Sequence, residues 1–97
     1  MSKEEKQKIY SDIVEFLKSK GATKVAVFGS YVRDEEKPES DIDLITEFPD
    51  DMSLLKFVRI ERELSDKIGR KVDLLTEEYI SPYFLDSVKL QMKILFQ

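Results

Sequence analysis

The sequence contains no cysteine and no histidine among its 97 residues. Without cysteine, neither disulfide bonds nor thiolate metal sites can form. Without histidine, the chain lacks the commonest general base and the commonest protein ligand of transition metals. Any metal ion that these side chains bind is therefore expected to be a hard cation held by carboxylate oxygens.

Long apolar runs and long basic runs are also missing. No apolar stretch is long enough to span a bilayer, and no apolar signal-peptide core follows the charged N-terminal SKEEKQK. The net charge of −4, with no block of Lys and Arg, disfavours direct binding of nucleic acid. The length and the 41% hydrophobic content predict one globular domain over residues 1–97, cytoplasmic and not bound to membranes.

Apolar periodicity and end signals predict three helices and at least three strands. The helices cover about residues 3–20, about residues 53–68, and a segment that begins at Ser81-Pro82. The strands are Lys24–Phe28, Ile42–Glu47 and residues 71–76, and Lys93–Phe96 is either a fourth short strand or the end of the third helix. The predicted fold class is α/β (α+β), a small mixed β-sheet of three to four strands with helices packed on one face.

The same periodicity predicts which helical side chains face the core. On the second helix these are Leu54, Phe57, Ile60, Leu64 and Ile68, whereas Leu55 is predicted to be exposed. On the third helix they are Phe84, Leu85, Val88 and Met92.

The run Asp41-Ile42-Asp43-Leu44 is the first candidate site. Alternation along a strand places Asp41 and Asp43 on one face and the two apolar side chains on the other. Like charges held side by side repel, and a divalent cation is the usual remedy. Carboxylates two residues apart lie roughly 6.6–6.8 Å apart along the strand. They can converge on two magnesium ions about 3.5–4 Å apart, which indicates a two-metal site.

The second candidate site is the Gly29-Ser30 turn, which follows a buried strand. Gly29 lets a phosphate approach the backbone closely, and the following N–H groups with the Ser30 hydroxyl can hold that phosphate. The alternative is a strand-to-helix turn that binds no ligand, for which Gly-Ser also serves.

These residues resemble a known family. Gly29-Ser30, Arg33 and Ser40-Asp41-Ile42-Asp43-Leu44 are similar to the G-S-x-x-R…S-D-x-D-L signature of the DNA polymerase beta-type nucleotidyltransferases. The short length resembles the minimal nucleotidyltransferase branch, whose domain is of about this size. The chain departs from many members at Asp34, where they have a second glycine.

The resemblance implies a role for each site residue. Asp41, Asp43 and Asp73 are expected to be the catalytic and metal-binding carboxylates, with Asp73 also orienting and deprotonating a hydroxyl nucleophile. The nucleotide-binding candidates are Gly29, Ser30, Arg33 and Ser40. Two alternatives stay open: Arg33 suits a structural carboxylate as well as a phosphate, and Ser40 can also merely shape the start of the strand.

The implied reaction is magnesium-dependent transfer of AMP from ATP onto a hydroxyl. Minimal nucleotidyltransferases resemble the antitoxin half of type VII-like toxin–antitoxin modules, so the resemblance implies that a Tyr of a helical HEPN-type toxin is the acceptor. Homo- and hetero-oligomers both stay open. The alternatives are transfer to a small molecule or an RNA end, and a non-catalytic antitoxin that acts by binding alone.

Overall fold

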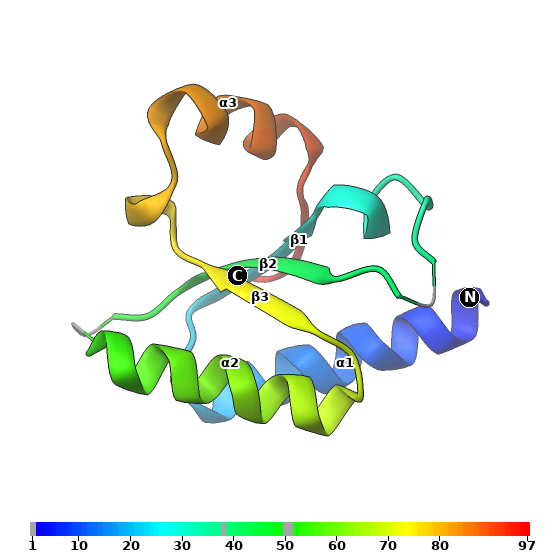
Figure 1. The fold of residues 1–97 in the computed structure, drawn as a ribbon, viewed down its shortest axis with the longest axis horizontal. Coiled ribbons are helices and arrows are strands. Elements are labelled where there is room, and N and C mark those ends of the chain that lie inside the picture. Colours follow the sequence, from blue (N-terminus) through cyan, green and yellow to red (C-terminus); the bar gives the residue numbers. More distant parts are fainter. Residues whose placement is uncertain (1, 38, 50–51) are drawn as a thin grey trace.

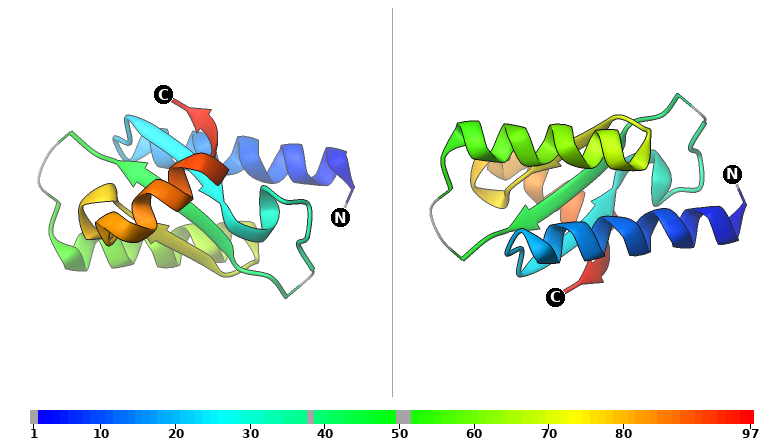
Figure 2. Two further views of the ribbon diagram at one scale, coloured as in Figure 1. Left: turned by 90° about the horizontal axis from the view of Figure 1, so that it is seen from above. Right: turned by 90° about the horizontal axis from the view of Figure 1, so that it is seen from below.

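The computed structural model describes residues 2–37, 39–49 and 52–97. Its centre is a sheet of four strands in the order β3-β2-β1-β4, with β1 at Lys24–Phe28, β2 at Ile42–Glu47, β3 at Val72–Leu75 and β4 at Lys93–Phe96. β1 pairs antiparallel with β2 and with β4, whereas β2 pairs parallel with β3. The predicted α/β class and mixed sheet are therefore confirmed (Figure 1), and the open choice for Lys93–Phe96 resolves to a strand (Figure 2).

Helices α1 (Lys3–Ser19) and α2 (Leu54–Ile68) cover one face of the sheet (Figures 1 and 2). Ser2 caps α1 by accepting a hydrogen bond from the Glu5 N–H at 3.1 Å, as its spacing predicts. Gly69 ends α2 in the left-handed conformation at φ 76°. The main core forms between these helices and the sheet, and its fully buried side chains include Ile13, Leu17, Val25, Val27, Ile42, Leu44 and Leu64.

Helix α3 (Pro82–Gln91) lies on the opposite face (Figure 1). Strand alternation turns Phe28 and Ile45 away from the main core, and they pack there with Ile80 and Val88. The expectation that the helices share one face therefore holds for α1 and α2 but not for α3. The reason is physical, since two large apolar side chains on this face need cover from water.

Two predicted core positions are wrong. Leu54 is 72% exposed and Phe84 is 55% exposed, and each lies in the first turn of its helix. Leu55 is exposed, as predicted. Among the residues that the structure describes, no helix is long and apolar enough to cross a membrane.

Candidate active site

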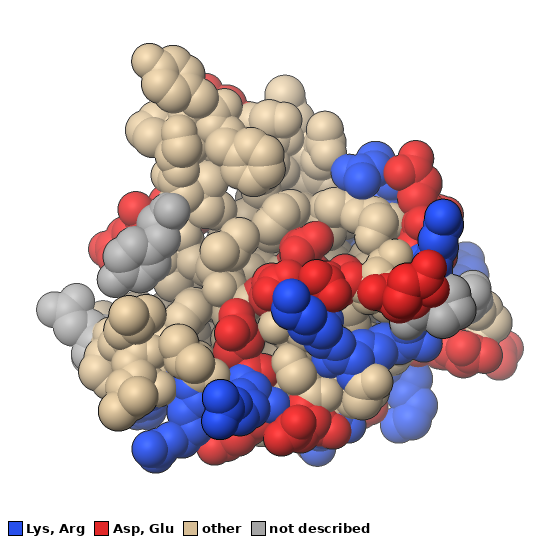
Figure 3. Space-filling model, viewed as in Figure 1, with Lys and Arg blue, Asp and Glu red and all other residues tan. Residues whose placement is uncertain are grey.

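Backbone register places the three predicted carboxylates on one face of the sheet. Leu44 of β2 pairs with Leu74 of β3, and both side chains enter the main core. Asp43 pairs with Asp73 one position earlier, so these two side chains point to the opposite face, which α3 also covers. Asp41 lies two residues before Asp43 and shares its face. Figure 3 shows acidic side chains gathered over the starts of β2 and β3, below the tan surface of α3.

The glycine-serine turn adjoins this acidic face. Phe28, the last residue of β1, pairs with Asp43, and the short 3₁₀ helix η1 (Gly29–Tyr31) follows at once. Gly29 has φ 76°, and a Cβ atom built on it would lie 2.7 Å from Asp43 Oδ2. That spacing is closer than side-chain carbons approach an oxygen, so only glycine fits beside this carboxylate. The two candidate sites are therefore one site.

The Asp43 carboxyl is shifted toward its protonated form. Its pKa is raised to about 6, first by burial and then by the charges of Asp73 and Asp41, with a further contribution from a side-chain hydrogen bond with Asp73. Burial and the two neighbouring acids both disfavour the charged carboxylate, and a cation bound between these acids would favour it.

Asp41 is drawn toward a lysine. The Lys71 Nζ lies 3.5 Å from Asp41 Oδ2, and the Ile42 N–H donates a hydrogen bond to the Lys71 carbonyl at 2.9 Å. Within the described parts of the chain, no group of three or more acidic side chains is assembled in a geometry that could hold a metal ion. The face is shared, but only Asp43 and Asp73 are in direct contact.

The other predicted nucleotide-binding residues are engaged locally. The Arg33 Nε donates to Glu35 Oε2 at 3.0 Å, and its Nη1 donates to Gln91 Oε1 at 3.4 Å. This arrangement corresponds to the structural alternative for Arg33. The Ser40 hydroxyl accepts a hydrogen bond from the Lys37 N–H at 2.8 Å and so shapes the turn before β2. Ser30, in contrast, follows Gly29 directly within η1.

Asp34, where the family resemblance leads us to expect a glycine, adopts the left-handed conformation at φ 56°. Its carboxylate pairs with the ammonium of Lys6 on α1, which also lies 2.9 Å from Glu36 Oε1. The Lys6 ammonium lowers the pKa of the Asp34 carboxyl. The extra negative charge after the turn is therefore neutralised by α1.

Sequence reasoning did not single out Lys6 or Lys71. For Lys6 no local signal exists, because its partners are 28 and 30 residues away and meet it only through tertiary packing. For Lys71 there was a signal: it alternates with Asp73, so it shares the face of that acid once residues 71–73 form a strand.

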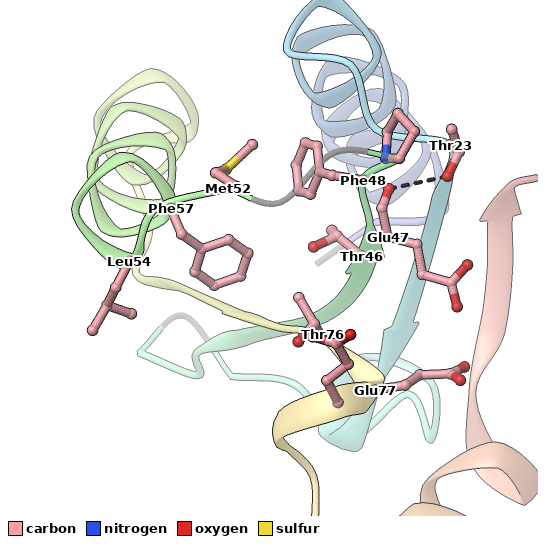
Figure 4. A pocket seen from close by; sticks show the side chains of 11 residues that line it. Thr23, Thr46, Glu47, Phe48, Met52, Leu54, Phe57, Thr76 and Glu77 are labelled. Atoms are coloured by element: carbon pink, nitrogen blue, oxygen red, sulfur yellow. Dashed lines mark hydrogen bonds between the residues drawn. The ribbon is translucent and has the colours of Figure 1, made fainter.

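A separate cavity of about 520 Å³ lies at the other end of the strands (Figure 4). The ends of β2 and β3 and the start of α2 line it, with Thr46, Phe57 and Thr76 around its interior. The buried Thr76 Oγ1 has no hydrogen-bond partner among the described residues. Because Asp43 and Asp73 lie at the starts of the same strands, this cavity is not part of the acidic site.

The family model described as "Nucleotidyltransferase domain" matches residues 10–95, which includes every candidate site residue. This chain belongs to the nucleotidyltransferase domain family. A relative from Methanocaldococcus jannaschii, named "Putative protein adenylyltransferase MJ0435", is 41% identical over 76 residues, covering 78% of this chain and 82% of the relative. The predicted family and enzyme class are thereby confirmed.

Solved structures confirm the nucleotidyltransferase fold. A crystal structure of a toxin–antitoxin pair with AMP-PNP matches at a TM-score of 0.81 and 22% identity, over 90% of this chain and 72% of that chain. A tri-AMPylated HEPN toxin from Shewanella oneidensis in complex with an MNT antitoxin matches at 0.76 and 22% identity, over 94% and 71% of the two chains.

The acidic face of the sheet fits a hard divalent cation. Its donors are carboxylate oxygens, the ligands that hard divalent cations prefer, and they come from three acids on one face of the sheet. Asp43 and Asp73 are already in contact, whereas Asp41 is the remaining donor and is held by Lys71. The residues present therefore suit the metal, provided that Asp41 leaves its ion pair.

Proposed function

We propose that this nucleotidyltransferase transfers AMP from ATP to a tyrosine hydroxyl of a helical HEPN-type toxin, and so acts as the antitoxin of a type VII-like module. The observation that carries the chemistry is the in-register contact of Asp43 with Asp73 beside the Gly29 turn. It joins paired acids, which can take a proton and bind cations, to a turn whose backbone N–H groups can bind a phosphate.

The reaction exchanges a phosphoanhydride bond for a phosphodiester bond. The acceptor oxygen attacks the α-phosphorus, a new P–O bond forms, the bond to the β-phosphate oxygen breaks, and pyrophosphate leaves. Asp73 orients the acceptor hydroxyl and takes its proton. Gly29 and Ser30 hold the β- and γ-phosphates through backbone N–H groups and the Ser30 hydroxyl. The protein's contribution is mainly positioning and electrostatic stabilisation.

Asp41, Asp43 and Asp73 would hold two Mg²⁺ ions, which when bound neutralise charge on the phosphates and lower the pKa of the acceptor hydroxyl. Arg33 and Ser40 are not proposed to contact the nucleotide directly. In the present conformation both support the loop between the turn and β2, so their contribution to nucleotide binding is expected to be indirect.

Two observations on relatives support the acceptor. The Methanocaldococcus relative is named "Putative protein adenylyltransferase MJ0435", and a structural neighbour comes from a complex of a tri-AMPylated HEPN toxin with an MNT antitoxin. ATP as donor is supported by the neighbour that contains AMP-PNP. We expect the reaction to occur in the cytoplasm, within a hetero-oligomer of toxin and antitoxin and without direct binding of nucleic acid.

The test uses labelled ATP, Mg²⁺, this protein, and a helical protein with an R-x-x-x-x-H motif encoded beside it. Label is expected on a tyrosine of the helical protein, and Asp41→Asn/Asp43→Asn is expected to abolish it. Asp86→Asn on α3 removes one exposed charge outside the site and should leave transfer intact. Undiminished transfer by the double variant would end the mechanism, and labelling of RNA or a small molecule instead would replace the acceptor.

A further inference from the structure

Lys71 stands at a fixed position in the acidic face. Because Ile42 pairs with Val72, the preceding residues Asp41 and Lys71 are neighbours on the two strands. The hydrogen bond from the Ile42 N–H to the Lys71 carbonyl holds this register at 2.9 Å. Two rows therefore cross the strands on the same face: Lys71 beside Asp41, and Asp73 beside Asp43.

Lys71 places a positive charge on the face of the sheet that carries the three acids. Its ammonium lies 3.5 Å from Asp41 Oδ2. Arg33 points instead to Glu35 and Gln91, and Lys6 to Asp34 and Glu36. Each of these two cations is already committed to acids outside the site.

The ion pair between Lys71 and Asp41 is also weak enough to be broken by a competing cation. The Lys71 side chain is 70% exposed and that of Asp41 is 41% exposed, so water screens their attraction. An exposed pair of this kind changes an equilibrium by about two- to fivefold. A divalent cation with several carboxylate ligands binds far more strongly and would displace the lysine.

We propose that Lys71 is the internal counter-ion of the metal site: it holds Asp41 in the metal-free protein and yields that carboxylate when Mg²⁺ binds. This role rests on the proposed function, because it requires that Asp41 be a metal ligand. It explains why the described acids form no three-carboxylate group in this conformation. Lys71 is in this sense a positioning residue for the metal ligand.

The experiment follows the thermal unfolding midpoint of the full chain against Mg²⁺ concentration, without nucleotide. In EDTA, Lys71→Gln should unfold at a lower temperature than the wild type, because the acids lose their counter-ion. Its half-saturating Mg²⁺ concentration should be about two- to fivefold lower, because no lysine competes for Asp41. Lys71→Gln should thus weaken the metal-free protein and strengthen its binding of Mg²⁺. A lysine with a merely structural role would produce the first effect without the second.

Two further variants complete the design. Lys71→Arg keeps the charge and should behave as the wild type. Lys56→Gln removes one exposed charge at the far end of α2, the helix that precedes β3, and should leave half-saturation unchanged. The difference between Lys71→Gln and the wild type should shrink in high salt, which screens the exposed pair.

Two results would overturn the inference, and they differ from each other. If the wild type responds to Mg²⁺ and Lys71→Gln responds at the same or a higher concentration, the counter-ion role is wrong and the proposed function stands. If the wild type shows no response at any concentration, the metal site of the proposed function fails, and the role of Lys71 fails with it.

Discussion

Gly29 and Asp43 are so close that a single methyl group at Gly29 would collide with the carboxylate. The added Cβ would lie 2.7 Å from Asp43 Oδ2, in a backbone conformation at φ 76° that disfavours any side chain. The turn that is proposed to hold phosphates and the acid that is proposed to hold metal are thus built as one unit.

Gly29→Ala is expected to abolish AMP transfer and to destabilise the protein. The left-handed backbone costs alanine about 1 kcal/mol, and displacement of Asp43 adds to it. Gly69→Ala is the matched control, because Gly69 also has φ 76° but a Cβ there meets nothing within 4 Å. Urea unfolding and transfer assays of both variants separate the two effects. Equal activity of the two variants would show that the contact with Asp43 is unimportant.

Asp43→Asn is expected to stabilise the metal-free protein at neutral pH. The pKa of Asp43 rises from 3.8 to about 6 on folding, mainly through burial and the charge of Asp73. A raised carboxyl pKa favours the protonated form in the folded state. The stabilising contribution of the protonated Asp43 carboxyl to the free energy of unfolding is therefore complete below pH 4. It is lost as pH rises through 6.

The expected gain for Asp43→Asn at pH 7.5 in EDTA is about 1–2 kcal/mol, less than the full shift implies because the side chain is only half-buried. At pH 4 the two proteins should differ little. Urea unfolding at both pH values measures the difference. A variant less stable than the wild type at pH 7.5 would contradict the repulsion.

Lys6→Met is expected to destabilise the protein by about 1–3 kcal/mol, because a buried carboxylate then loses its partner. The Glu36 side chain is only 7% exposed, and the Lys6 ammonium is 2.9 Å from its Oε1. Lys8→Met is the control: the Lys8 side chain is 79% exposed, and its pair with Asp12 at 3.5 Å is screened by water. Chemical denaturation of both variants gives the comparison, and equal losses would mean that the Lys6 cluster is no stronger than a surface pair.

Leu64→Ala is expected to cost about 2–5 kcal/mol, since it opens a cavity in the main core. Leu64 is fully buried, whereas Leu55 on the same helix is 75% exposed. Leu55→Ala should therefore change the free energy of unfolding by no more than about 0.5 kcal/mol. A large loss for Leu55→Ala would reveal that this side chain is covered in solution, for example by a second molecule.

The strands and helices could largely be predicted from sequence, because their signals are local. β1 and β2 have the predicted bounds, and Ser2, Ser53 and Gly69 cap the helices as their types predict. The sharing of one face by Asp41 and Asp43 also followed from alternation alone.

What could not be predicted depends on contacts between distant segments. The contact of Asp43 with Asp73 requires that β3 pair parallel with β2 and in one particular register. The exposure of Leu54 depends on what packs around the first turn of α2, and the position of α3 depends on which face still has apolar side chains to cover. Asp34 departs from the glycine that the resemblance leads us to expect. Its backbone nevertheless adopts the left-handed conformation that glycine adopts easily.

The register in which β2 pairs with β3 serves both stability and the site, because it buries the core side chains and also aligns Asp43 with Asp73. If β3 slipped by one position, Asp73 would enter the main core, and Val72 and Leu74 would turn to the face that carries the acidic site. Such a molecule would bury a carboxylate and lose two apolar side chains from its core. We therefore expect it to unfold and not to persist as a folded but inactive species. Any preparation that melts as one cooperative species should therefore consist of molecules with their acids aligned.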